Sequence, residues 1–135
     1  MSLLADTSVW SLALRRDIPE PVPEVEALGR MLGRGREEVF VTGLVLQELL
    51  QGFIGPRART EIIEKLSALT VLVPQMHDHI EAAELHNRCR KAGVQIETVD
   101  ALLAQLCIHH DLIMLAIDRD FVQIAKHSAL KLWKG

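Results

Sequence analysis

Four carboxylates stand where a folded chain would not place a charge for stability alone: Asp6, Glu48, Asp100 and Asp118. Asp6 and Asp118 close short apolar runs, so each is expected at the carboxyl end of a buried strand. Glu48 and Asp100 lie within helical patterns rich in apolar residues, where an unpaired charge is costly. Carboxylates that meet repel one another unless they are protonated or hold cations. This set therefore indicates a metal-dependent site that cleaves phosphodiester bonds.

The metal expected at such a site follows from its ligands. Carboxylate oxygens select Mg²⁺, or Mn²⁺, over softer metals. Two such ions activate a water for in-line attack on phosphorus and stabilise the leaving oxygen. No covalent nucleophile or histidine base is indicated by the sequence.

Each carboxylate also has a simpler structural explanation. Asp100 shares a helix face with apolar residues, but an aspartate in a first turn also complements the helix dipole. Glu48 fits the exposed edge of a mostly buried helix, although Gly52, one turn later, would leave room for substrate. Asp6 and Asp118 fit caps of following helices. In open parallel sheets, however, sites form outside the carboxyl ends of the strands.

The elements that must position these side chains follow from apolar runs that alternate with longer helical patterns. This alternation predicts parallel strands joined by helical crossovers. A helix near residues 7–16 is expected to end before a proline-rich, extended connection at 18–23. Strands are expected near residues 2–6, 39–41, 70–73, 112–118 and 130–133. The predicted fold is α/β, with three layers (α/β/α) around a central, mainly parallel sheet of four to five strands.

The length and composition agree with this fold. A chain of 135 residues with 49% hydrophobic content is long enough for one compact domain, residues 1–135. No apolar stretch approaches the roughly 20 residues that cross a bilayer. We therefore expect a cytoplasmic protein without a membrane partner.

Four ordered segments resemble the PIN-domain ribonucleases, particularly the VapC-type toxins of bacterial toxin–antitoxin pairs. They are Asp6-Thr7-Ser8-Val9-Trp10, Glu48-Leu49-Leu50-Gln51-Gly52, Thr98-Val99-Asp100-Ala101-Leu102-Leu103-Ala104 and Asp118-Arg119-Asp120-Phe121. The resemblance implies a PIN-like fold in which Asp6, Glu48, Asp100 and Asp118 are the catalytic, metal-binding carboxylates. It also implies that Asp120 assists them, and that Thr7 or Ser8 orients Asp6 or a metal-bound water.

The same resemblance implies an activity and partners. They are a metal-dependent endoribonuclease that cleaves cellular RNA with metal-activated water, a homodimer, and a small cognate antitoxin that covers the active site. One position departs from the family pattern, because Ala116 stands where a threonine or serine is usual. That departure removes a supporting hydroxyl near Asp118 but no ligand.

The charge pattern is compatible with an RNA substrate. The net charge is −3, but four of the 18 acidic residues belong to the proposed site, and the other 14 nearly balance 15 basic residues. Arginines, which suit phosphate contacts, form three groups, and each also fits a solvated face. These groups are Arg30, Arg34 and Arg36; Arg57 and Arg59; and Arg88 and Arg90. Few aromatic residues are present, so backbone and shape contacts should dominate recognition.

Other residues carry weaker signals. Cys89 and Cys107 fall on apolar helix stripes and are expected in the core. The runs His77-Asp78-His79 and His109-His110 offer no zinc partners at useful spacing along the chain, so surface or helix-end roles are expected. Trp10 is expected in the core, although with Leu12 and Leu14 it also fits a dimer or antitoxin groove.

Two alternative functions remain at this point. An aspartyl-phosphate phosphatase would use Asp6 as its nucleophile, but Ser8 stands where its second acid is needed. A catalytically silent α/β interaction module would explain Asp6 and leave Glu48 and Asp100 without a role.

Overall fold

The sheet at the centre of the protein is wholly parallel. The computed structural model describes residues 2–15 and 20–135. Within them, five strands lie in the order β3-β2-β1-β4-β5. They are β1 (Leu3–Ala5), β2 (Val39–Thr42), β3 (Thr70–Leu72), β4 (Ile113–Leu115) and β5 (Lys131–Leu132). The expected α/β fold with a mainly parallel sheet of four to five strands is confirmed.

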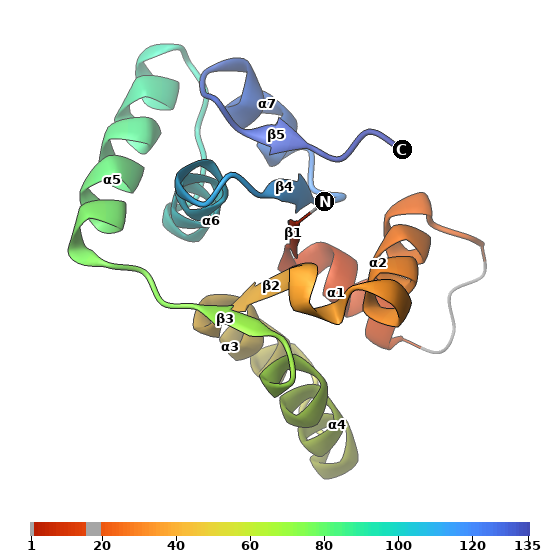
Figure 1. Cartoon of the computed structure of the whole chain (residues 1–135). Helices are drawn as coiled ribbons and strands as arrows, with labels where there is room; N and C mark the ends of the chain where they lie inside the picture. The colour runs from red at the N-terminus through yellow and green to blue at the C-terminus, as the bar shows by residue number, and fades with distance from the viewer. Residues whose placement is uncertain (1, 16–19) are drawn as a thin grey trace.

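Helices form the two outer layers (Figure 1). On one side lie α1 (Thr7–Leu14), α2 (Pro23–Arg34), α3 (Gly43–Gly52) and α4 (Pro56–Ser67), with a 3₁₀ turn at Arg36–Glu38. On the other lie α5 (Met76–Lys91), α6 (Thr98–His109) and α7 (Asp120–Lys126). This division follows from right-handed crossovers that run outward from β1 to β3 and then return through β4 to β5.

The connection between α1 and α2 is only partly described. The helix expected near 7–16 ends at Leu14, and its last expected residue lies outside the described residues. The proline-rich connection expected at 18–23 also begins outside them. From Pro23 the chain is helical, with proline in the first turn of α2, where its missing N–H is not needed.

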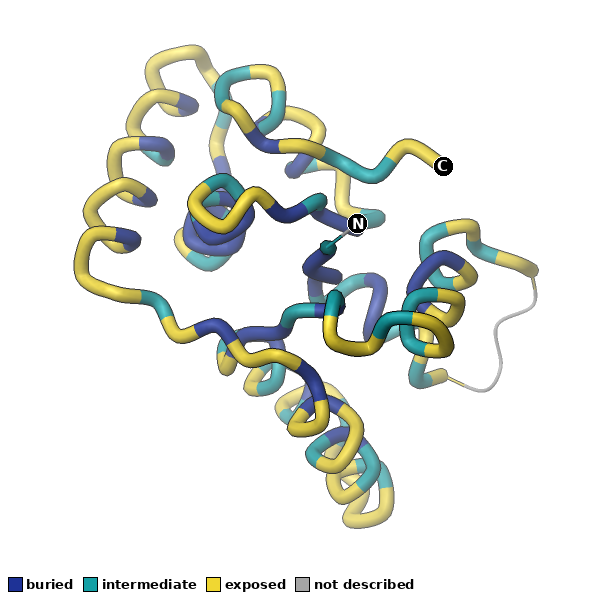
Figure 2. Tube along the Cα trace, in the orientation of Figure 1, coloured by how far each residue is buried: buried dark blue, intermediate teal, exposed yellow. Residues whose placement is uncertain are grey.

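The positions of β1 and α6 in the core explain why most of their residues are apolar. All three residues of β1 are fully buried, as expected for a central parallel strand with helices on both faces. Helix α6 is buried over most of its surface, and Figure 2 shows it largely in dark blue and teal beside α5. Cys89 and Cys107 are buried free thiols in this core, as predicted. No helix in the described part of the chain is long and apolar enough to span a bilayer.

The sheet has a topological switch point between β1 and β4. The chain leaves these adjacent strands toward opposite helical layers. In open α/β sheets, ligand sites form in the space beyond the carboxyl ends of two such strands, and we call this space the crevice. In register, Ala5 of β1 pairs with Leu115 of β4. The strand expected at 112–118 is therefore too long: β4 ends at Leu115, and β5 pairs only with Ile113 and Met114. Asp118 lies in the loop beyond the strand.

Candidate metal centre

Asp6 is fixed at the junction of β1 and α1. It directly follows the strand, and only 4% of its surface is exposed. One oxygen, Oδ1, accepts hydrogen bonds from the Ser8 hydroxyl at 2.7 Å and from the Val9 backbone N–H at 3.2 Å. The carboxylate thus caps α1, as its structural explanation anticipated, yet a cap does not require burial beside other acids.

Ser8 also supports the loop that carries Asp118. Its hydroxyl oxygen accepts a hydrogen bond from the Ile117 backbone N–H at 3.3 Å while its hydrogen goes to Asp6. One hydroxyl therefore ties the end of β1 to the loop after β4. The Ser8 hydroxyl thus lies beside the loop that contains Ala116, the position at which a threonine or serine is usual.

Glu48 reaches the same region from α3. Its Oε1 accepts a short hydrogen bond, 2.6 Å, from the Thr7 hydroxyl at the start of α1. Of the two hydroxyls expected to orient Asp6 or a metal-bound water, that of Ser8 donates to Asp6, whereas that of Thr7 donates to Glu48. Gly52 lies at the end of α3 with open space where a side chain would stand, as expected for a position that leaves room for substrate.

Asp100, Asp118 and Asp120 form the acidic cluster on the other side of the crevice. One carboxylate oxygen from each lies within 4.8 Å of those of the others. Asp100 is half-buried in the first turn of α6. Asp118 is exposed, and its Oδ1 accepts the Asp120 backbone N–H at 2.9 Å. The apolar residues that share the helix face of Asp100, which are Leu103, Ala104 and Cys107, are buried, and so is most of the rest of α6.

The pKa values show how these carboxylates affect one another. Burial raises the pKa of Asp6 to about 6, against the lowering effect of Ser8 and Val9, and the charges of Asp118 and Glu48 raise it further. Burial also raises the pKa of Asp100 to about 7, with contributions from Asp118, Glu97, Asp120 and Asp6. Asp6 is therefore electrostatically coupled to Glu48, Asp118 and Asp100, whereas the carboxylate oxygens that lie within 4.8 Å of one another are those of Asp100, Asp118 and Asp120. The fold holds these carboxylates at a cost in electrostatic free energy.

The donor set fits a hard divalent cation. Every candidate ligand is a carboxylate oxygen, and no histidine or thiol belongs to the cluster among the described residues. A cation would offset the repulsion that raises the pKa values of Asp6 and Asp100. The arrangement is chemically suited to bind an ion and an anionic phosphate beside it.

Comparison with known proteins assigns the fold to a family. Residues 3–127 match the family model described as PIN domain. The chain belongs to the PIN-domain family. The resemblance noted in the sequence is thereby confirmed for nearly the whole chain.

Relatives of this PIN domain are named as ribonucleases. "Ribonuclease VapC11" of Mycobacterium tuberculosis is 27% identical over 131 residues, covering 96% of both chains. Among solved structures, DNA-bound VapBC from Salmonella typhimurium matches with a TM-score of 0.75 at 12% identity, covering 98% of this chain and 97% of that one. FitAcB from Neisseria gonorrhoeae matches with a TM-score of 0.70 at 18% identity, covering 98% and 96%. The structural matches show a common fold.

The arginine groups are distributed differently around this PIN domain. Arg36 lines a groove between α1, α2 and α4, away from the carboxylates. Arg57 and Arg59 are exposed in the first turns of α4. Arg88 donates to the His127 carbonyl and Arg90 to the Asn87 side chain, so this pair takes part in structural contacts.

Proposed function

We propose that this PIN domain is a metal-dependent endoribonuclease and acts as the toxin of a type II toxin–antitoxin pair. The observation that carries the proposal is the electrostatic coupling of Asp6 with Glu48, Asp118 and Asp100 beside the switch point of the sheet, together with the close carboxylates of Asp100, Asp118 and Asp120. The names of its relatives support a ribonuclease rather than another phosphoryl-transfer enzyme. Cellular RNA as substrate implies action in the cytoplasm.

The protein's own residues would prepare the site in distinct ways. Asp6 and Asp100 are proposed as the principal metal ligands, with Glu48 and Asp118 completing the set and Asp120 assisting. Ser8 orients Asp6, and Thr7 orients Glu48, so that both carboxylates point into the crevice before substrate arrives. Bound Mg²⁺ or Mn²⁺ would supply water activation and stabilisation of the leaving oxygen.

The exposed start of α4 is proposed to guide the RNA backbone. Arg57 and Arg59 follow closely after α3, the helix that carries Glu48, and guanidinium groups bind phosphate in a bidentate manner. The expected products carry 5′-phosphate and 3′-hydroxyl ends, because the attacking group is water rather than the ribose 2′-hydroxyl.

Sequencing of cellular RNA ends after brief induction tests this activity. Wild-type protein should create new 5′-phosphate ends, and Asp6→Asn should not. Purified protein should require Mg²⁺ or Mn²⁺. Cleavage that persists after chelation, or identical end profiles from wild type and variant, would reject the proposed activity.

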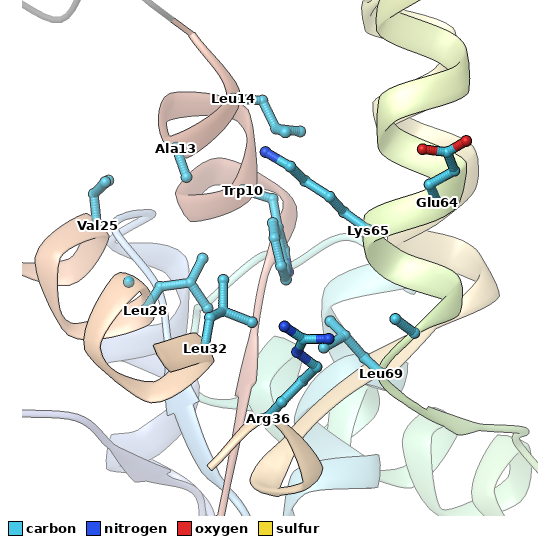
Figure 3. Close-up of a pocket in the computed structure, with 12 residues that line it drawn as sticks. Trp10, Ala13, Leu14, Val25, Leu28, Leu32, Arg36, Glu64, Lys65 and Leu69 are labelled. Atoms are coloured by element: carbon cyan, nitrogen blue, oxygen red, sulfur yellow. The ribbon is translucent and has the colours of Figure 1, made fainter. Parts of the chain in front are cut away.

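A groove on the α1–α4 side is proposed to receive the antitoxin (Figure 3). Its volume is about 500 Å³, and its walls come from α1, α2, α4 and the residues that follow α4. Apolar residues dominate the walls: Trp10, Leu14, Val25, Leu28, Leu32 and Leu69. Two of the three residues predicted for such a groove, Trp10 and Leu14, line it, whereas Leu12 does not.

Polar groups in the groove indicate what the antitoxin segment should contain. Arg36 and Lys65 line the groove and outnumber its one carboxylate, Glu64, so they favour an acidic side chain on the occupant. We therefore propose an amphipathic antitoxin segment with apolar anchors and at least one carboxylate.

Binding of the small protein encoded beside this gene tests the groove. Leu32→Glu should weaken the complex at least tenfold, because it introduces a charge among apolar contacts. Val122→Glu is the matched control, since Val122 is an exposed apolar residue of α7 outside the groove. Equal affinities for the two variants would contradict docking in this groove.

A homodimer is proposed through the segment that connects β3 to α5. Exposed apolar residues accumulate there: Val71, Val73, Met76 and Ile80, each more than half exposed. Exposed apolar residues that are close together along the chain favour an interaction site. Val73→Lys should convert the dimer to a monomer in light-scattering measurements, and an unchanged mass would exclude this interface.

A further inference from the structure

A second cluster of metal-ligating side chains joins α5 to α6, outside the carboxylate crevice. His77 and Asp78 lie in the first turn of α5, and His109 is the last residue of α6. The two segments are far apart in the sequence, so no zinc pattern is visible along the chain. The antiparallel packing of the helices brings them together.

Asp78 is the centre of this cluster. Among the described residues, only Asp6 and Asp78 are buried carboxylates, and the Asp78 side chain is 1% exposed. Its Oδ2 accepts the Gln75 backbone N–H at 2.9 Å and so completes a capping box at the start of α5. Capping uses this oxygen alone, which leaves Oδ1 available to other groups.

Both histidines approach the remaining oxygen. His109 Nδ1 lies 2.8 Å from Asp78 Oδ1, and His77 Nε2 lies 3.6 Å from it. The three donor atoms all fall within 4.8 Å of one another. Ligand atoms that share one Zn²⁺ at about 2.0–2.2 Å are separated by roughly 3–3.5 Å. The observed separations lie on either side of that range, so small side-chain rotations would bring the three atoms to the distances expected around one zinc ion.

We propose that His77, Asp78 and His109 form a Zn²⁺ site distinct from the candidate nuclease site. Two imidazole nitrogens and one carboxylate oxygen suit zinc and similar transition metals, whereas the all-oxygen crevice suits Mg²⁺. The histidine side chains are 52% and 35% exposed, so ions have access and water can complete the coordination.

The two sites lie at opposite ends of α6. Asp100 is in its first turn and His109 at its last residue, a separation of roughly 13 Å along the axis. Zinc would thus cross-link the start of α5 to the end of α6 without contacting the carboxylates. Its expected effect is greater stability of the helix pair, because an ion that binds only the folded protein shifts the folding equilibrium.

Zinc titration of the untagged, full-length protein tests the proposal. Calorimetry in excess Mg²⁺ should find one zinc per chain for wild type and for Asp100→Asn. His77→Asn should weaken zinc binding at least tenfold. This substitution is safe for folding because the Asp78–His109 hydrogen bond and the helix cap remain.

His79→Asn is the matched control, since His79 lies on the same helix but outside the cluster. It should bind zinc as wild type does and show the same zinc-induced rise in melting temperature. Equal zinc affinity for wild type and His77→Asn would overturn the proposed site. Loss of zinc binding in Asp100→Asn would instead assign the ion to the carboxylate crevice. Neither result depends on whether the protein cleaves RNA.

Discussion

Asp6 and Asp78 are buried to nearly the same extent, yet their surroundings shift their pKa values in opposite directions. Burial raises the pKa of Asp6 to about 6, and neighbouring carboxylates add to that effect. Burial also acts to raise the pKa of Asp78, but hydrogen bonds from Gln75 and His109, with the charges of both histidines, lower it overall. Burial by itself therefore does not decide the direction in which the pKa of a carboxyl group shifts. The charges and hydrogen bonds beside the group decide it.

The largest expected effect is on catalysis at the acidic crevice. Asp100→Asn preserves the shape of the side chain but removes a charge that the metal requires. RNA cleavage in vitro should fall by at least about 10²-fold, as when a group that stabilises transition-state charge is lost.

Asp111→Asn provides the control for that measurement. Asp111 is exposed and pairs with Lys131, away from the crevice. Activity close to wild type in Asp111→Asn, with loss in Asp100→Asn, would assign the effect to the crevice. Equal activities in the two variants would remove Asp100 from the site.

The second effect is on folding at the α5–α6 joint. Asp78→Ala deletes a helix cap and leaves His109 without its carboxylate partner. The free energy of unfolding should fall by about 2 kcal/mol in denaturant titrations. Glu81→Ala, an exposed position of the same helix, should change it little. A similar loss in both variants would mean that Asp78 contributes no more than helix propensity.

The third effect concerns the Ser8 hydroxyl, which links the end of β1 to the loop after β4. Ser8→Ala removes the hydrogen bonds to Asp6 and from Ile117. Because residues that orient metal ligands typically contribute about 10–100-fold, the Mg²⁺ concentration for half-maximal activity should rise about tenfold. Ser11→Ala, on the same helix, should leave it unchanged. A normal Mg²⁺ requirement in Ser8→Ala would show that Asp6 is oriented without Ser8.

The smallest effect is the pH dependence of stability without metal. The pKa of Asp100 is about 7 in the folded protein, above its ordinary value of 3.8. Between these values the folded state binds a proton that the unfolded state lacks, so stability falls as pH rises from about 4 to 7. Asp100→Asn should therefore melt a few degrees higher than wild type at pH 8 and close to it at pH 4. A constant difference across this range would contradict the raised pKa.

The contribution of Asp78 to stability should depend on pH in the opposite direction. Its lowered pKa means that its contribution is present above the ordinary value and is lost as pH falls through the folded value. The difference between wild type and Asp78→Asn should accordingly shrink in acid. A difference in stability that grows as pH falls would contradict the lowered pKa of Asp78.

The amino-acid sequence alone was enough to predict the parallel α/β fold and to single out the four carboxylates that are proposed as its metal site. Both predictions rest on local patterns: apolar runs set the strands, and an acid at a strand end or in an apolar helix is visible within a few residues. The family resemblance had the same basis, because each of its motifs is a short continuous segment.

Only the tertiary structure decided which groups support those carboxylates and where a second metal site lies. Thr7 contacts Glu48 across 41 residues, Ser8 contacts Ile117 across 109, and Asp78 contacts His109 across 31. The early end of β4, at Leu115, likewise depends on where its pairing with β1 stops, at Ala5. Such contacts depend on how separate elements pack, and packing imposes no spacing on the chain that a local pattern reveals. The histidines therefore looked unrelated in sequence, and the fold made them neighbours.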